Sequence, residues 1–221
     1  MSQLASLPVP PAGLVRRMAE YADTPLTELL QPYRKYEAQL RQLYAQEPEH
    51  ELVKDPHANL LPLFTNDTPS IKTRARNLGS ESEKEKEKYI MALPEDQRRP
   101  NGSPATVQSL KEFQHNFSVF SESSLIDLDW NNVVAAGSSV VNCLLPVPEK
   151  YSTSKRVLRE FYHEKFSPAS DVDLFLYGLS EEEAIEKIKD IETRIRDSIL
   201  TETTTVRTKN AITICESCMM V

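Results

Sequence analysis

The clearest alternation of apolar and polar residues in the chain falls at 170–178, Ser-Asp-Val-Asp-Leu-Phe-Leu-Tyr-Gly. Side chains at positions i and i+2 of a strand share a face, so this pattern predicts a strand over 171–177. Its first face carries aliphatic residues: Val172, Leu174 and Leu176. Asp171 and Asp173 share the second face with Phe175 and Tyr177. Apolar residues on both faces predict an interior strand, and two acids at its start then require a positive partner.

A helical pattern follows this strand. Ser180 is a good N-cap, Glu183 lies at the N3 position of a capping box, and the acids between them suit the positive end of a helix. Its apolar stripe predicts which side is buried: Ala184, Ile185, Ile188, Ile191 and Ile195. The expected helix is the most strongly specified one in the chain.

A second long helical pattern begins near Thr24-Pro25, with Thr24 as N-cap and Pro25 in the first turn. Its apolar face is spaced by alternating steps of four and three residues: Leu29, Tyr33, Tyr36, Leu40 and Leu43. Pro32 falls inside this pattern and is expected to kink or divide the helix, because proline lacks the backbone donor.

Shorter patterns complete the second half of the chain. We expect a helix after Ser103-Pro104, a strand at 133–136, and a short helix at 140–145 ended by Pro146. A further helix is expected around 154–166, and a strand over 206–214 with Arg207 and Lys209 on one face. Strands alternating with helices predict an α/β (α+β) fold, with a mixed sheet, flanking helices and a helical, proline-rich extension before it.

The predicted domain organisation follows from composition. Fifteen prolines stand against five glycines, and most of the prolines lie in the first half. We expect a disordered N-terminus at 1–20, a helical extension at 21–65, a charged linker at 66–104 and a folded domain at 105–221. The linker contains a run of alternating charge at 80–88 that predicts a solvated helix or disorder.

Charge and cysteine content limit the function. The net charge of −7 gives no broad basic field, which makes nucleic acid an unlikely partner. No apolar run reaches the roughly 18 residues of a membrane span, and the first residues lack a signal-peptide pattern. Three cysteines without a signal peptide indicate an intracellular, reducing location, cytoplasmic or nuclear, with no disulfide framework. The C-x-x-C at 215–218 is interpreted as chance, because a lone pair cannot complete a zinc site.

The candidate chemistry lies in two stretches. Gly137, Ser138 and Ser139 join a strand to a helix, where backbone N–H groups and hydroxyls can hold a phosphate. Asp171 and Asp173 would ligate Mg²⁺, which prefers carboxylate and phosphate oxygens. Together these residues predict a site for a magnesium–nucleoside triphosphate. The alternative is purely structural: the serines cap a helix and the acids lie at a sheet edge.

These stretches resemble the signature of the nucleotidyltransferase superfamily that includes DNA polymerase β, which is a strand, Gly-Ser, a short helix and a strand with Asp-x-Asp. Four segments, AAGSSVVNCLLPVP, SDVDLFLYGL, EEAIEKIKDIE and TVRTKNAITI, are similar to a family of fungal and large-virus proteins often labelled ankyrin repeat proteins. No ankyrin repeat is present in the sequence itself. The resemblance implies Mg-NTP binding at Gly137, Ser138 and Ser139 and catalytic, metal-binding roles for Asp171 and Asp173.

The chain departs from the superfamily pattern in two ways. Residues 146–169 lengthen the distance between Ser138 and Asp171, and the chain stops before the strand that carries a third carboxylate in active members. Glu202 and Glu216 are the nearest acids, but neither has the expected context. We therefore expect a C-terminally incomplete domain that binds nucleotide, with catalysis in doubt because the third carboxylate is missing. The alternative is a non-catalytic interaction module of an ankyrin-repeat-type scaffold, with a protein partner still unknown.

Overall fold

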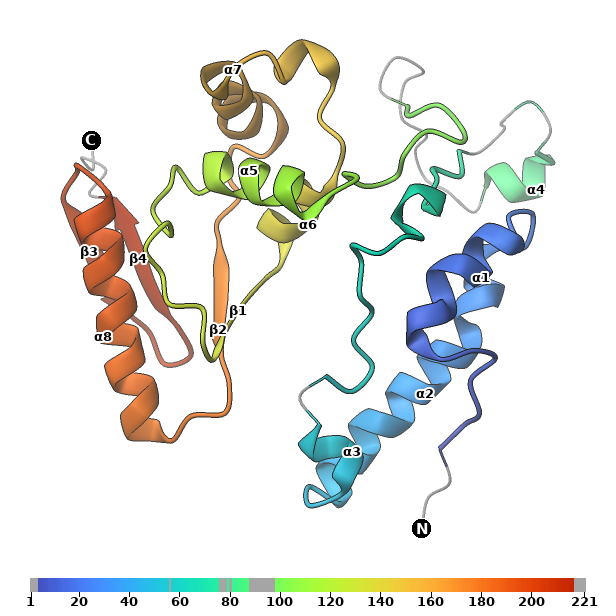
Figure 1. The fold of residues 1–221 in the computed structure, drawn as a ribbon, viewed down its shortest axis with the longest axis horizontal. Helices are drawn as coiled ribbons and strands as arrows, with labels where there is room; N and C mark the ends of the chain where they lie inside the picture. The colour runs from blue at the N-terminus through green and yellow to red at the C-terminus, as the bar shows by residue number, and fades with distance from the viewer. Residues whose placement is uncertain (1–3, 56, 76–78, 80, 88–97, 217–221) are drawn as a thin grey trace. The chain divides into compact units, whose positions relative to one another are not determined.

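The computed structural model describes residues 4–55, 57–75, 79, 81–87 and 98–216 (Figure 1). The chain forms two compact units, Met1–Ser109 and Leu110–Val221. About 47% of the chain is helical, and the strands form two small antiparallel pairs, so the α/β class is confirmed. No described helix is long and apolar enough to cross a membrane.

The first unit is helical. Its described elements are two 3-10 turns at Pro11–Gly13 and Thr68–Ser70 and the helices α1 (Leu14–Glu20), α2 (Leu26–Gln46), α3 (Glu51–Lys54) and α4 (Glu83–Lys86). Helix α1 lies within the segment predicted to be disordered, and its Val15 is 3% exposed. Burial of one apolar residue in the first turn of α1 therefore gives part of this segment a defined structure.

Helix α2 follows the expected apolar pattern closely. Its buried residues, Leu29, Tyr33 and Leu43, all belong to the predicted stripe. The N-cap is Pro25 rather than Thr24, so the helix begins one residue later than expected. Pro32 does not divide it: α2 is continuous through that position, where packing of Leu29 and Tyr33 on either side offsets the lost hydrogen bond.

Side-chain contacts to the backbone hold the irregular parts of this unit. The guanidinium of Arg74 donates to the carbonyls of Thr24 at 2.7 Å and Met18 at 2.5 Å. These carbonyls lie at or beyond the end of α1, where a positive charge is favourable. The hydroxyl of Thr68 donates to the Leu63 carbonyl at 2.7 Å and accepts from the Thr65 backbone. Proline-rich backbone is thus ordered by a few strong side-chain bonds.

The region expected to be a linker has paired ends. The backbone N–H of Thr73 donates to Ser103 at 2.8 Å, and that of Gly102 donates to Thr73 at 2.9 Å. Lys72 and Pro104 form an antiparallel bridge. Most of the alternating charged run at 80–88 is described, and Glu83–Lys86 form the single helical turn α4. Ser80, Lys88 and residues 89–97 lie outside the described residues.

The second unit carries all four strands of the two named sheets (Figure 1). Its elements are α5 (Leu110–Phe120), β1 (Val133–Ala136), α6 (Ser138–Leu144), a 3-10 turn (Glu149–Tyr151), α7 (Lys155–Glu160), a π turn (Phe161–Phe166), β2 (Asp173–Leu176), α8 (Glu181–Ser198), β3 (Thr203–Arg207) and β4 (Ile212–Glu216). Strand β1, helices α6 to α8 and strand β2 were predicted. Helix α5 begins at Leu110, later than the expected start after Pro104.

The described strands do not form the single mixed sheet that was expected. β1 pairs antiparallel with β2, and β3 pairs antiparallel with β4. The prediction of one strand over 206–214 was wrong, because this segment turns back on itself. Thr208 makes the turn: its backbone N–H donates to Ala211 at 2.8 Å, and its hydroxyl accepts from Ala211 at 3.1 Å.

Two hydrophobic clusters hold the second unit together. The first contains Val119, Phe120, Cys143, Leu158, Phe161 and Tyr162, and the second contains Leu125, Leu128, Val133 and Ile191. Phe117 and Val172 pack against both clusters. Ile214 packs against the second cluster, and the Thr205 hydroxyl donates to Glu192 at 2.7 Å, so the β3–β4 hairpin is attached to α8.

The predicted capping box at the start of α8 is confirmed. The Ser180 hydroxyl accepts from the Glu183 backbone at 3.3 Å, and the Glu183 carboxylate accepts from the Ser180 backbone at 2.8 Å. These two bonds satisfy donors that a helix start leaves unpaired. They also fix the direction in which the chain leaves β2.

Candidate functional site

The antiparallel pairing of β1 and β2 brings Gly137 next to Asp173. Ala136 is the register partner of Asp173, so Gly137 follows directly at the end of the strand pair. Gly137 has φ of 79°, a left-handed conformation that favours glycine. A methyl group on its Cα would lie 2.5 Å from Oδ2 of Asp173. The Asp173 carboxylate therefore lies directly against the glycine backbone, a position that a side chain would obstruct.

Hydrogen bonds join the start of α6 to the segment before β2. The hydroxyls of Ser138 and Ser170 are 2.6 Å apart. Asn142, one turn along α6, donates to the Ser167 hydroxyl at 2.7 Å and lies 3.5 Å from that of Ser170. Asp171 follows Ser170 directly, so these bonds hold the chain entering β2 beside the first turn of α6. Their spacing of four residues along α6, from Ser138 to Asn142, was a usable signal in the sequence.

Ser139 has a different environment from its neighbours. Its side chain has no exposed surface, and its hydroxyl donates to the Ala136 carbonyl at 3.4 Å. The hydroxyl is thus part of the strand-to-helix turn. The whole residue is buried, so the backbone N–H of Ser139 in the first turn of α6 has no exposed surface either.

Asp171 and Asp173 are both exposed. Among the described residues, neither carboxylate has a hydrogen bond or an ion pair. Two other acids of this unit are paired, Asp129 with Lys187 at 2.9 Å and Asp190 with Arg194 at 2.8 Å. Exposed carboxylates without a cation partner are free to ligate a hard metal ion.

The described residues contain no group of three or more His, Cys, Asp or Glu side chains that could hold a metal. Glu216 lies in β4 opposite Thr203, and Glu202 directly precedes β3. Both acids thus belong to the β3–β4 hairpin and not to the β1–β2 pair. The described site offers two carboxylates.

The face of β2 that carries the acids is open. Phe175 is 58% exposed, Tyr177 is 48% exposed, and Val134 on β1 is 46% exposed. The expectation that β2 is an interior strand was therefore wrong for this face. A two-stranded sheet has one face on the core, and β2 uses Val172, Leu174 and Leu176 for it. The second face keeps the two acids and two aromatic rings together.

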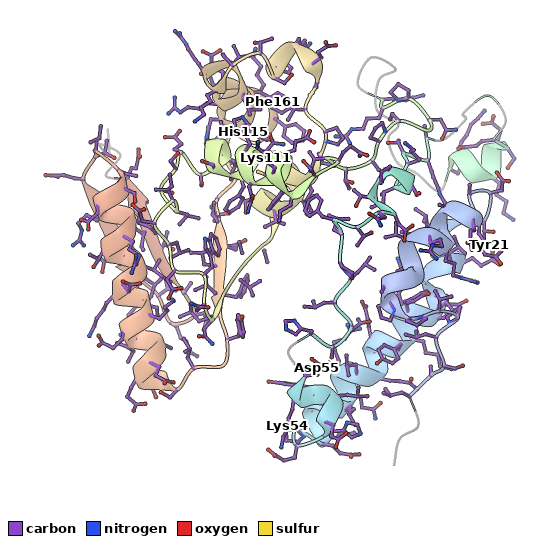
Figure 2. The ribbon with its side chains drawn as sticks, in the orientation of Figure 1. Tyr21, Lys54, Asp55, Lys111, His115 and Phe161 are labelled. Carbon is purple, nitrogen blue, oxygen red and sulfur yellow. The ribbon has the colours of Figure 1, made fainter. Side chains whose placement is uncertain are left out.

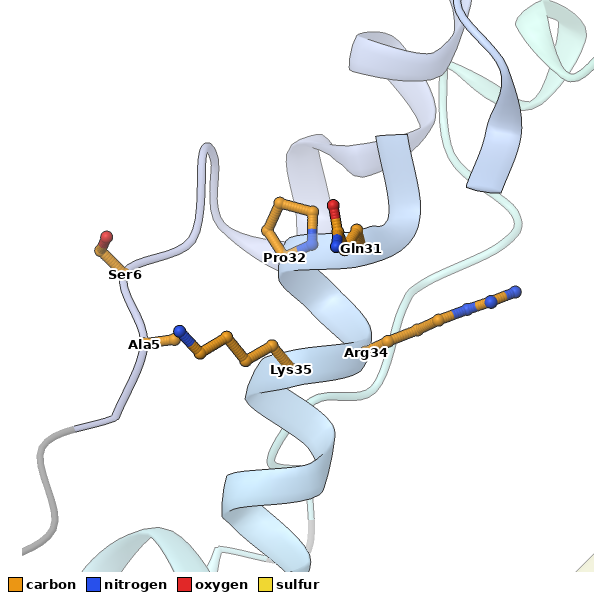
Figure 3. A pocket seen from close by; sticks show the side chains of 6 residues that line it. All are labelled: Ala5, Ser6, Gln31, Pro32, Arg34 and Lys35. Carbon is orange, nitrogen blue, oxygen red and sulfur yellow. The ribbon is translucent and has the colours of Figure 1, made fainter. Parts of the chain in front are cut away.

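Two hollows in the described surface lie away from Gly137 and Asp173. One is formed in the first unit against α2 (Figure 3), and its lining residues are Ala5, Ser6, Gln31, Pro32, Arg34 and Lys35. A second is an acidic hollow beside α8, where Asp129, Glu186 and Asp190 surround Lys187. Gly137 and Asp173 line neither of these two hollows.

The two cysteines of the described structure differ in exposure. Cys143 is fully buried in the first hydrophobic cluster, and burial raises the pKa of its thiol to about 12. Tyr162 is equally buried next to it, and burial raises the pKa of its phenol as well. Cys215 is exposed on β4, while Ser217 and Cys218 of the C-x-x-C lie outside the described residues.

Arg207 and Lys209 do not share the face of one strand. Arg207 ends β3, and Lys209 lies in the turn that leads to β4. Both are exposed. The hairpin thus separates the two cations that the single predicted strand placed together.

No protein-family profile, curated protein or solved structure matches the chain. Its secondary structure defines it as a mixed α/β protein with two antiparallel strand pairs.

Proposed function

We propose that the second unit is a nucleotidyltransferase-like domain that binds a magnesium–nucleoside triphosphate. Asp171 and Asp173 would hold the metal, and Gly137, Ser138 and Ser139 would hold the phosphates. One observation carries the proposal: the unpaired Asp173 carboxylate lies against Gly137, whose left-handed φ of 79° disfavours a side chain. The two predicted motifs are far apart in sequence, and their contact supports a shared site.

Each residue has a specific part in this proposal. The carboxylates of Asp171 and Asp173 supply oxygen ligands, and bound Mg²⁺ supplies positive charge to the phosphates. Gly137 lets a phosphate approach the backbone. The Ser138 hydroxyl would donate at the surface, whereas the buried Ser139 would act through the shape of the strand-to-helix turn, which its hydroxyl stabilises by bonding the Ala136 carbonyl. Ser170 and Asn142 keep the two halves in register.

The proposal favours binding over turnover. Two-metal phosphoryl transfer requires ligands for ions on both the attacking and leaving oxygens. The described residues place two acids at the strand pair, and the remaining candidates, Glu202 and Glu216, lie on the hairpin. The finer fold, a nucleotidyltransferase-like mixed sheet, is part of this proposal and is supported by the order Gly-Ser, short helix, Asp-x-Asp strand.

A second candidate is a non-catalytic interaction module. It is favoured by the open face of the β1–β2 pair, where Val134, Phe175 and Tyr177 are each about half exposed. Exposed apolar residues gathered on one face commonly indicate a contact surface for another protein. The same face contains the two acids, so the two candidates compete for the same residues.

Calorimetric titration distinguishes the nucleotide site from the interaction module. ATP with Mg²⁺ is titrated into the folded protein, into Asp171→Asn/Asp173→Asn, and into the charge-matched control Glu181→Gln/Glu182→Gln. We expect magnesium-dependent binding that the first pair of changes abolishes and the control retains. Absence of magnesium-dependent heat with the unchanged, folded protein contradicts the nucleotide site and favours the interaction module.

A further inference from the structure

The segment between α6 and β2 contains a basic and aromatic surface that the proposed nucleotide site does not use. Residues 149–166 carry five lysines and arginines against three glutamates, in a chain whose net charge is −7. This segment forms the 3-10 turn, α7 and the π turn of the second unit. Its positive charge is therefore local, and it stands out from an acidic molecule.

Three aromatic rings stack through this segment. Phe161 lies between Tyr151, at 4.8 Å between ring centroids, and Phe166, at 5.0 Å. Figure 2 labels Phe161 at the point where α7 passes into the π turn. Phe161 is buried, whereas Phe166 is 41% exposed. The stack thus ends at the surface in a ring on which a further planar group can lie.

Two lysines converge on the other end of the stack. The ammonium of Lys150 lies 4.8 Å from the centroid of the Tyr151 ring, and that of Lys165 lies 5.0 Å from the same centroid. Among the described residues, neither ammonium pairs with a carboxylate. A cation–π contact positions a positive charge without neutralising it. Both charges therefore remain available to an anion.

The neighbouring arginines are already paired. Arg156 bonds Glu160 at 3.2 Å, and Arg159 bonds Glu122 at 2.6 Å. The three lysines of this segment, Lys150, Lys155 and Lys165, have no carboxylate partner among the described residues, and of these Lys150 and Lys165 lie over the Tyr151 ring. Two like charges held near one ring repel each other, and a bound anion would relieve that repulsion.

We propose that Tyr151, Phe166, Lys150 and Lys165 form a binding surface for single-stranded nucleic acid. Such a strand presents phosphates and flat bases in turn, and a protein meets it with cations and stacking rings side by side. The lysines contact phosphates, and the exposed Phe166 ring stacks on a base. An acidic peptide carries negative charges but lacks the flat bases that stack on aromatic rings. The aromatic stack therefore favours nucleic acid. The proposal is independent of the nucleotide site.

Fluorescence anisotropy with a fluorescein-labelled 12-nucleotide oligo(U) tests this surface. The unchanged protein is expected to bind at 50 mM salt and to weaken as salt rises. Lys150→Gln/Lys165→Gln should reduce the magnitude of the slope of log K against log salt by about 1.4, since each phosphate contact contributes roughly 0.7. Lys35→Gln/Lys72→Gln removes the same charge from exposed residues of the first unit and should leave the slope unchanged.

Phe166→Ala separates stacking from charge. It should weaken oligo(U) binding about tenfold, a typical effect of removing one stacking ring, and leave the salt slope unchanged. Circular dichroism checks that each variant is folded, and the lysine pair tests the proposal should Phe166→Ala unfold. No binding by the unchanged protein overturns the proposal. So does equal loss in the Lys35/Lys72 control, or binding of a labelled polyglutamate peptide as tight as that of oligo(U).

Discussion

The two faces of strand β2 have different environments, although their residues alternate along one short segment. Val172, Leu174 and Leu176 pack against the cluster of Leu125, Leu128, Val133 and Ile191. Asp171, Asp173, Phe175 and Tyr177 are exposed. A half-buried strand normally places polar residues on the face away from the core. The outer face of β2 instead combines unpaired acids with large rings.

This difference assigns the two faces separate roles. Residues of the inner face contribute stability, because their burial removes apolar surface from water. Residues of the outer face gain nothing comparable in the described structure, and for this reason we propose that they meet a ligand or a partner. Substitutions on one face at a time test whether the two faces have these separate roles.

Leu174→Ala should have the largest effect on stability. Leu174 is half-buried against the second cluster, and its truncation should cost about 2 kcal/mol, at the low end for a leucine in a core. Phe175→Ala, the next residue on the outer face, should cost under about 0.5 kcal/mol. Urea unfolding followed by circular dichroism measures both. Equal losses for the two variants would mean that the outer face is also packed.

Gly137→Ala should have the second-largest effect on stability. The left-handed φ of 79° alone costs a residue with a side chain about 1–2 kcal/mol, and the new methyl group also meets the Asp173 carboxylate. We expect the free energy of unfolding to fall by about 1.5 kcal/mol. Adding Asp173→Ala should restore the part due to contact and leave the part due to φ. Strictly additive losses in this double-mutant cycle would contradict a close approach of the two residues.

Asp171→Asn/Asp173→Asn should change stability least. Without a metal, removing two adjacent unpaired charges should alter the free energy of unfolding by less than about 0.5 kcal/mol, with any change in the stabilising direction. Addition of Mg²⁺ and ATP should raise the melting temperature of the unchanged protein only. A large loss of stability in the metal-free variant would show that the two acids have partners that hold the fold.

The capping box at Ser180 and Glu183 should make the stability of the protein depend on pH. The Ser180 backbone and hydroxyl hold the pKa of the Glu183 carboxyl below its ordinary value. A lowered pKa in the folded state means that the ionised form stabilises α8 above the unfolded pKa, and that this stability is lost as pH falls through the folded pKa. Glu183→Gln should therefore flatten the loss of stability between about pH 5 and pH 3.

Glu182→Gln is the matched control, since Glu182 lies in the same first turn of α8 without a part in the capping box. Its acid unfolding curve should keep the slope of the unchanged protein. Equal flattening in both variants would assign the effect to the charge of the turn and not to the Ser180–Glu183 bonds.

Local signals in the sequence predicted local structure well. The capping box at Ser180 and Glu183 and the apolar stripe of α2 depend on neighbours within a few residues, and the structure contains both. The Gly137 and Asp173 motifs were predicted to meet, and the register of β1 and β2 brings them together. Short-range chemistry was enough for the capping box and the stripe, whereas the meeting of Gly137 and Asp173 depends on pairing between distant segments.

The predictions were wrong where strand pairing or side-chain burial determines the structure. A strand pattern cannot tell whether its second face is covered, so Phe175 and Tyr177 suggested an interior strand although both are exposed. The 206–214 segment has strand-forming residues at both ends, but Lys209, Asn210 and Ala211 between them disfavour a strand, and Asn210 was a turn signal that the prediction of one strand passed over. The burial of the Ser139 hydroxyl likewise follows from packing and not from the Gly-Ser-Ser motif.

Paramagnetic broadening by Mn²⁺ tests the central claim most directly. Mn²⁺ replaces Mg²⁺ at oxygen ligands, and it broadens amide resonances near its site in an ¹⁵N-labelled protein. With ATP present, our account predicts selective broadening at Gly137, Ser138, Asp171 and Asp173, absent from Asp171→Asn/Asp173→Asn. Broadening that is confined to the acidic hollow around Asp129 and Glu186, or that persists in the double variant, would contradict the account.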